Sequence, residues 1–302
     1  MRKRVLEESV MFISIIKWFF LATAVGIIVG GSTTFFLKAL EGAISFSDRY
    51  AYSFLILPLA LFLSSLVVKY LSPEAEGHGT EKVIEAVHKR SGKINPLVVP
   101  IKLIATIITI MFGGSAGKEG PCAQIGAGLS SIFSSLFRFN DKDRMKLVMC
   151  GISAGFSTVF GTPIAGAIFG VEVLFVGSLL YDVLFPSFVA GIVGYQVSSL
   201  LGITYFHQPL SFVPIFSSLL FTKVCISGIF FGLCAFLFIE LMKFIESISK
   251  NMRIWKPYKG FVGGAALVVL TVIFSGKLLG LGLETIQVAL EGDYVNPLLF
   301  MG

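Results

Sequence analysis

The sequence predicts an all-α membrane protein that crosses the bilayer several times. Of its 302 residues, 55% are hydrophobic and only 14% are charged, and the mean hydropathy is +0.87. Soluble domains carry about 25% charged residues, so this chain has too few charges to cover a surface that faces water. The second observation is a set of long stretches with almost no charge, each near the roughly 20 residues that a helix needs to span a bilayer core. They are 18–37, 51–68, 120–137, 147–171, 183–222 and 260–276.

These stretches predict about eight to ten hydrophobic segments, some of them too short to span. The longest stretch, 183–222, has room for a span and a turn, which we place at Gly202 or at His207–Pro209. The first stretch exceeds the core of a signal peptide and has no small-residue cleavage site after it, so it is predicted to remain as the first transmembrane helix.

The net charge of +6 does not indicate a nucleic-acid partner, because the basic residues gather at the ends of apolar stretches. The clusters lie at 2–4, 88–93, 138–146 and 243–259. This is the positive-inside pattern of an integral, multi-pass protein of the plasma (inner) membrane, with the N-terminus on the cytoplasmic side. The four cysteines have neither metal-ligand nor redox spacing, so we expect no metal and no other cofactor.

The chain repeats part of itself. Residues 77–87 and 280–290, 203 positions apart, both read G-x-G-x-E-x-(V/I)-x-x-A-(V/L). Gly26 and Gly30 of an earlier apolar stretch correspond to Gly228 and Gly232, each 202 positions later. Repeated halves are common in transport folds. A basic cluster precedes the first of these helices and follows the second, which predicts that the two halves are inverted.

The predicted first repeat covers about residues 10–205, and a partial second repeat covers about 212–302. A complete second repeat would need on the order of 100 further residues. We therefore interpret the chain as a fragment or a shortened form, and expect these 302 residues alone to transport poorly.

The most informative stretch is 113–121, where four glycines and a proline precede an apolar helix. Non-helical backbone of this kind is tolerated within a membrane only when it is buried in protein or lines a water-filled cavity. Pro121 suits the first helical position, and the N–H groups around Gly120 are then left without helical partners. A helix N-terminus of this kind binds anions, and Gly117 and Gly120 leave room for an ion to approach the backbone.

Glu119 lies at this predicted site. An ionised carboxylate there would occupy the place of an anion, and its protonation or displacement would free the site, so we predict that Glu119 is a gate. The alternatives are an ion pair with Lys118 or a plain helix cap. The segment Gly77–Gly79 provides a similar flexible backbone before a helix predicted to start near Thr80–Glu81. Two further segments, 151–155 and 161–166, predict close helix packing and another break.

These motifs resemble the CLC chloride channels and anion/proton exchangers. The segment Gly117–Pro121, followed by Gln124–Gly126, is similar to the signature of that family, and Gly151–Glu172 is similar to its next conserved block. Pro73–Gly79 aligns with its first anion-coordinating loop. The resemblance implies two inverted repeats, a homodimer with one pore per subunit, and transport of small anions, chloride first. It assigns anion contacts to Gly77, His78, Gly79, Gly117, Lys118, Gly120 and Pro121.

The chain departs from the family pattern at two positions and at its end. His78 stands where the family usually has a serine, which leaves a fluoride- or nitrate-selective protein open and also leaves His78 open as an ordinary helix-cap residue. The resemblance places Glu172 and Val173 at the inner proton path of the exchangers, where Val173 stands in place of a titratable glutamate. This favours passive conduction, with proton-coupled exchange as the alternative. A later anion-coordinating loop and the pore tyrosine of the family lie beyond residue 302.

Two other classes compete with anion transport. Gly151–Gly155 fits the G-x-S-x-G motif of a serine hydrolase, but both flanks are predicted to be helical and the motif needs a strand before Ser153. A cation or proton transporter could use Glu119 and Glu172 as an acidic pair. Cation sites need convergent carboxylates or carbonyls, whereas Glu119 lies at the positive end of a helix. We therefore expect no enzyme.

Overall fold

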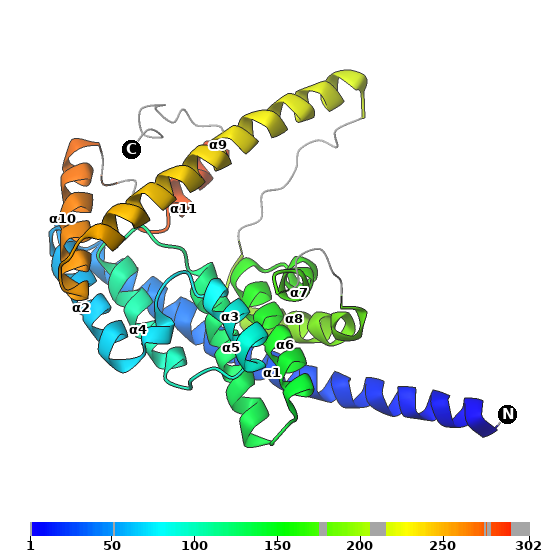
Figure 1. The fold of residues 1–302 in the computed structure, drawn as a ribbon. Helices are drawn as coiled ribbons and strands as arrows, with labels where there is room; N and C mark the ends of the chain where they lie inside the picture. Colours follow the sequence, from blue (N-terminus) through cyan, green and yellow to red (C-terminus); the bar gives the residue numbers. More distant parts are fainter. Residues whose placement is uncertain are drawn as a thin grey trace.

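The computed structural model describes residues 2–50, 52–174, 180–205, 216–274, 276 and 279–290. All regular structure in these residues is helical (Figure 1). The α-helices of the first part are α1 (Arg2–Ser47), α2 (Leu57–Leu71), α3 (Thr80–Arg90), α4 (Val98–Met111), α5 (Glu119–Leu136), α6 (Asp141–Phe160), α7 (Pro163–Glu172) and α8 (Tyr181–Leu200). The later ones are α9 (Ser218–Asn251), α10 (Lys256–Ile273) and α11 (Leu283–Leu290), and short 3-10 turns lie at Ser53–Ile56 and Pro73–Ala75.

Five of the described segments are long and apolar enough to cross a membrane; they are Phe12–Ser47, Ser53–Leu71, Tyr181–Leu200, Ser218–Asn251 and Lys256–Ile273. The apolar helices α4 and α7 are shorter, with 14 and 10 residues. At 1.5 Å per residue α4 reaches only about 21 Å, less than the hydrocarbon core. The predicted all-α, multi-pass architecture with incomplete spans is therefore confirmed.

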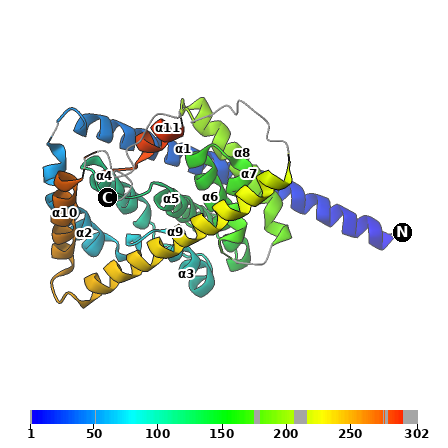
Figure 2. The ribbon, with the colours of Figure 1, turned by 90° about the horizontal axis from the view of Figure 1, so that it is seen from above.

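Helices α5 and α6 form the centre of the first part, with α1 and α8 against α6 (Figures 1 and 2). Their backbones approach closely at glycines. A Cβ atom on Gly126 would lie 2.2 Å from the Gly151 carbonyl oxygen, and one on Gly155 would lie 2.6 Å from the oxygen of Cys122. Only glycine fits such crossings, so the small-residue spacing of segment 151–155 serves helix packing as predicted.

The breaks between helices fall at the predicted glycines. Helix α6 ends at Phe160, its C-cap Gly161 has a φ of +68°, and α7 begins two residues after this glycine, at Pro163. Helix α8 is followed by a turn at Gly202, with a φ of +82°, which is one of the two predicted turn positions. The other, His207–Pro209, lies outside the described residues.

In both Gly-x-Gly loops of the predicted repeats, the two glycines have positive φ values. Gly77 and Gly280 have φ values of +82° and +72°, Gly79 and Gly282 have +95° and +68°, and a helix begins at the next residue in both loops. These left-handed values favour glycine. The shared geometry supports the repeat, whose bounds at 10–205 and 212–302 stay a prediction.

The helices of the predicted second repeat lie along one side of the first. Helix α10 packs beside α2, and α9 crosses the top of the molecule in Figure 1. The α9 side chains are largely exposed. Its glycines Gly228 and Gly232 have no described atom within 4 Å of a built Cβ, whereas Gly26 and Gly30 of α1 pack against α8.

Candidate functional site

Helix α5 begins at Glu119, with Lys118 as its N-cap. Pro121 is therefore the third helical residue, and its predicted place at the first position is wrong by two residues. Proline is tolerated there because the N–H groups of the first turn have no carbonyl partner within the helix. The first helical bond in this turn runs from the Cys122 N–H to the Lys118 oxygen, at 3.2 Å. The N–H groups of Glu119 and Gly120 precede that bond, as an anion site at a helix N-terminus requires.

The predicted loop at Gly77–Gly79 lies directly against this helix start. A Cβ atom on Gly120 would lie 2.0 Å from the His78 carbonyl oxygen, and one on Gly79 would lie 2.7 Å from the Gly120 oxygen. Gly79 is also the N-cap of α3. The N-termini of α3 and α5, which are 39 residues apart in sequence, therefore meet with no side chain between them. Two positive helix ends at one point favour an anion there.

The Glu119 side chain turns back over its own loop. A Cβ atom on Gly117 would lie 2.3 Å from Glu119 Oε2, so the carboxylate covers the space that a side chain at position 117 would fill. Within the described residues Glu119 forms no ion pair with Lys118, the structural alternative for this carboxylate. Glu119 is half-buried, whereas Gly117 and His78 are exposed.

The second Gly-x-Gly loop, at residues 280–282, contacts the segment 113–120 that leads into α5. The Gly280 N–H donates to the Gly113 carbonyl oxygen at 3.2 Å. Leu281 and Ala116 pack against a buried cluster that includes Ile110 and Cys122. The stretch 113–120 is therefore contacted by one Gly-x-Gly loop from each predicted repeat.

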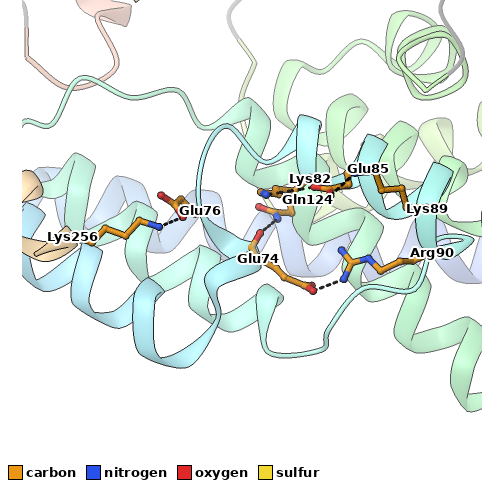
Figure 3. Close-up of polar contacts among 8 residues, drawn as sticks. All are labelled: Glu74, Glu76, Lys82, Glu85, Lys89, Arg90, Gln124 and Lys256. Carbon is orange, nitrogen blue, oxygen red and sulfur yellow. Dashed lines mark hydrogen bonds and ion pairs between the residues drawn. The ribbon is translucent and has the colours of Figure 1, made fainter. Parts of the chain in front are cut away.

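The segment 73–79, here called the anion loop, is held by polar contacts on both sides (Figure 3). On its outer side, Glu74 pairs with Arg90 and Glu76 pairs with Lys256. On its inner side, Gln124 Nε2 of α5 donates to the Glu74 carbonyl oxygen at 2.9 Å (Figure 3).

Lys102 of α4 is the site residue that sequence reasoning missed. It is 6% exposed, and its Nζ donates to the carbonyl oxygens of Ala75 at 3.1 Å and Gly77 at 2.6 Å. A signal was present, because Lys102 is the only charged residue in the apolar stretch of α4. Ionisable residues inside membrane segments are rare and usually functional.

The predicted inner residues Glu172 and Val173 lie at the C-terminal end of α7. Glu172 is the last residue of the helix and is exposed. Val173 is half-buried and packs on an apolar cluster that also contains Val83 and Val87 of α3. The described contacts of the anion loop do not include either residue.

The hydrolase motif does not have the geometry of a nucleophile elbow. Ser153 lies in the middle of α6 and is fully buried, and its hydroxyl donates to the Met149 carbonyl oxygen at 3.0 Å. An elbow places the serine on an exposed turn between a strand and a helix. The position of Ser153 instead suits the close packing of α6.

Comparison with known proteins assigns the fold and the family. A family model described as voltage gated chloride channel matches residues 59–302. The chain belongs to this family. The family is one of channels and transporters, in keeping with the helical setting of Ser153.

Within the chloride channel family, the chain is 34% identical to a chloride/fluoride channel protein of Pseudomonas syringae pv. tomato over 90% of its own length. It spans 62% of the length of that relative. The crystal structure of a CLC-type fluoride/proton antiporter matches with a TM-score of 0.87 and 26% identity, over 93% of this chain and 71% of the other. A slow cyanobacterial Cl−/H+ antiporter shares the fold, with a TM-score of 0.79 and 22% identity over 92% of this chain and 68% of the other.

Proposed function

We propose that this chloride channel family member forms part of a transmembrane pathway for small anions, chloride first. The observation that carries the proposal is the contact between Gly79 and Gly120, which brings the N-termini of α3 and α5 together. The positive ends of two helix dipoles then lie together, and the first N–H groups of each helix have no partner within it. This environment suits an anion better than a cation. The proposed anion contacts are those that the family resemblance implies: Gly77, His78, Gly79, Gly117, Lys118, Gly120 and Pro121.

Glu119 gates this site by competition. Its carboxylate lies at the start of α5 over Gly117. When ionised, it competes with an anion for the N–H groups of this helix end. Protonation removes the charge and most of the attraction to the helix end, so the anion replaces the side chain. Acid therefore opens the site.

Proton-coupled exchange is the second candidate, and one finding favours it: the solved relative with a TM-score of 0.87 is described as a fluoride/proton antiporter. The Pseudomonas relative is described as a chloride/fluoride channel protein, which favours passive conduction. Val173 favours the passive alternative, because a valine at the inner position cannot carry a proton. A fluoride- or nitrate-selective protein is the alternative to chloride, because His78 stands where the family usually has a serine.

The family and the charge pattern support a membrane location, a topology and an assembly for the protein. The chain is an integral, multi-pass membrane protein. The basic residues at 2–4 support a cytoplasmic N-terminus in the plasma membrane. A homodimer with one pathway per subunit is the assembly that the family resemblance supports.

Anion binding by the purified protein in detergent tests the proposal. We expect calorimetric titration to detect chloride, fluoride or nitrate binding that strengthens as the pH falls, and no binding of sodium or potassium. Equal responses to anions and cations would contradict the proposal. Uptake of radioactive chloride into liposomes under an imposed pH gradient distinguishes the two candidates, because only an exchanger lets the proton gradient drive chloride uphill.

A further inference from the structure

Two buried side chains, Lys102 and Gln124, donate hydrogen bonds to carbonyl oxygens of the anion loop. Lys102 binds the carbonyl oxygens of Ala75 and Gly77, and Gln124 binds that of Glu74. The two side chains are 6% and 2% exposed. Three carbonyl groups of one short loop therefore point inward, toward α4 and α5.

The direction of a carbonyl fixes the direction of the following N–H. In a planar trans peptide the two groups point in opposite directions, and the described chain has no cis peptide bond. Because the Gly77 oxygen points at Lys102, the N–H of His78 points away from α4. The positive φ values of Gly77 and Gly79 allow the chain to hold this peptide plane.

The residue that carries this N–H lies beside the contact between α3 and α5. His78 immediately precedes Gly79, the N-cap of α3, and the His78 oxygen lies against Gly120. Among the described residues no backbone oxygen accepts the His78 N–H. Its place at the start of α3 makes it a donor available to an anion.

The positive charge of Lys102 also favours an anion near the loop. Its hydrogen-bond partners are neutral carbonyls, and in the described part of the chain no carboxylate lies within ion-pair distance of it. A buried cation of this kind is costly unless another negative group compensates it. A small anion at the neighbouring helix ends would supply that compensation.

We propose that Lys102 is a positioning residue for anion binding: it holds the Gly77–His78 peptide so that the His78 N–H faces the anion. This inference rests on the proposed function, which already includes His78 among the anion contacts, and adds the side chain that orients its N–H. Gln124 holds the adjacent Glu74 carbonyl and supports the same loop from α5.

Anion titration of protein labelled with isotopic nitrogen at histidine tests the proposal directly. The chain has three histidines, and the signal that disappears in the His78→Gln variant identifies the His78 amide. We expect fluoride or chloride to move this signal in the wild-type protein and to leave that of His88, inside α3, unmoved. In Lys102→Met the same movement should need about tenfold more anion, as expected for loss of a charge-assisted contact. Lys102→Arg should recover part of the affinity.

Ser64→Ala is the matched control. Ser64 is 8% exposed and donates to the Ala105 oxygen of α4, one turn from Lys102 but away from the anion loop. We expect its anion affinity to equal that of the wild type. If Lys102→Met does not fold, Gln124→Met must shift the His78 titration in the same direction for the proposal to stand.

The outcomes separate this inference from the proposed function. If calorimetry detects no anion binding to the wild-type protein, both are wrong. If the wild type binds anions but the His78 signal does not move, or moves equally in wild type and Lys102→Met, only the positioning role is wrong. Equal loss of affinity in Lys102→Met and Ser64→Ala would also overturn it, because the effect would then be general loss of packing.

Discussion

Gly120 shows at the scale of one residue how the site depends on close backbone contact. A methyl group there would lie 2.0 Å from the His78 oxygen, and because that neighbour is backbone it cannot rotate away. We predict that Gly120→Ala lowers the free energy of unfolding by about 1–3 kcal/mol, the usual cost of overpacking, and abolishes chloride binding. Thermal unfolding in detergent and calorimetry measure the two effects.

Gly42→Ala is the control for that substitution. A Cβ atom at Gly42 meets nothing within 4 Å, and the residue lies in helix α1. Alanine should stabilise the helix there by about 0.5–1 kcal/mol. Equal destabilisation by both variants would show that the contact between Gly120 and His78 does not exist in the membrane protein.

His78 is proposed to influence which anion binds. Its side chain is exposed and lies between two glycines at the meeting of the two helix ends. We predict that His78→Ser changes the ratio of fluoride, chloride and nitrate affinities while the unfolding temperature stays within the range of surface substitutions. Unchanged ratios of the fluoride, chloride and nitrate affinities would show that His78 is an ordinary helix-cap residue and does not determine selectivity.

At the scale of the element, α1 and α8 cross at glycines. A Cβ atom on Gly30 would lie 2.8 Å from the Cα atom of Gly194, whereas one on Gly232, the corresponding residue of α9, meets no described atom. We predict that Gly30→Ala destabilises the protein by about 1–3 kcal/mol and that Gly232→Ala does not. Thermal unfolding of the two variants measures the difference, and equal effects would contradict the α1–α8 crossing.

The helices themselves were largely predictable, because their limits depend on local chemistry. The apolar stretches predicted the helices, and Gly161 and Gly202 predicted two of the breaks between helices. The start of α5 was wrong by two residues, because proline fits any position of a first turn that lacks carbonyl partners. The sequence alone did not reveal that α3 and α5 meet at Gly79 and Gly120, because this contact depends on packing between distant segments.

At the scale of the whole molecule, an ion pair joins the two predicted repeats. Lys256 at the start of α10 pairs with Glu76 of the anion loop, and the two side chains are 48% and 46% exposed. Exposed pairs contribute about 0.2–1 kcal/mol. We predict that Lys256→Glu lowers the unfolding temperature and anion affinity slightly, and that adding Glu76→Lys restores both.

A double-mutant cycle measures that pair, and high salt is its control. The coupling should shrink as salt screens the charges. Additive effects of the two substitutions at low salt would show that the repeats are not joined here. The sequence did not suggest this pair, because charge spacing in one chain does not reveal which distant loop lies beside α10. Lys102 was missed for a different reason, since one lysine in an apolar stretch indicates function but not its partners.

The central claim is that Glu119 competes with an anion for the helix ends at Gly79 and Gly120. The most direct test is chloride titration of the wild-type and Glu119→Gln proteins at acid and at neutral pH. Glutamine removes the charge at nearly constant volume. We expect the wild type to bind chloride more tightly in acid, and Glu119→Gln to bind chloride equally tightly at both pH values. A Glu119→Gln protein that keeps the pH dependence of the wild type would contradict it.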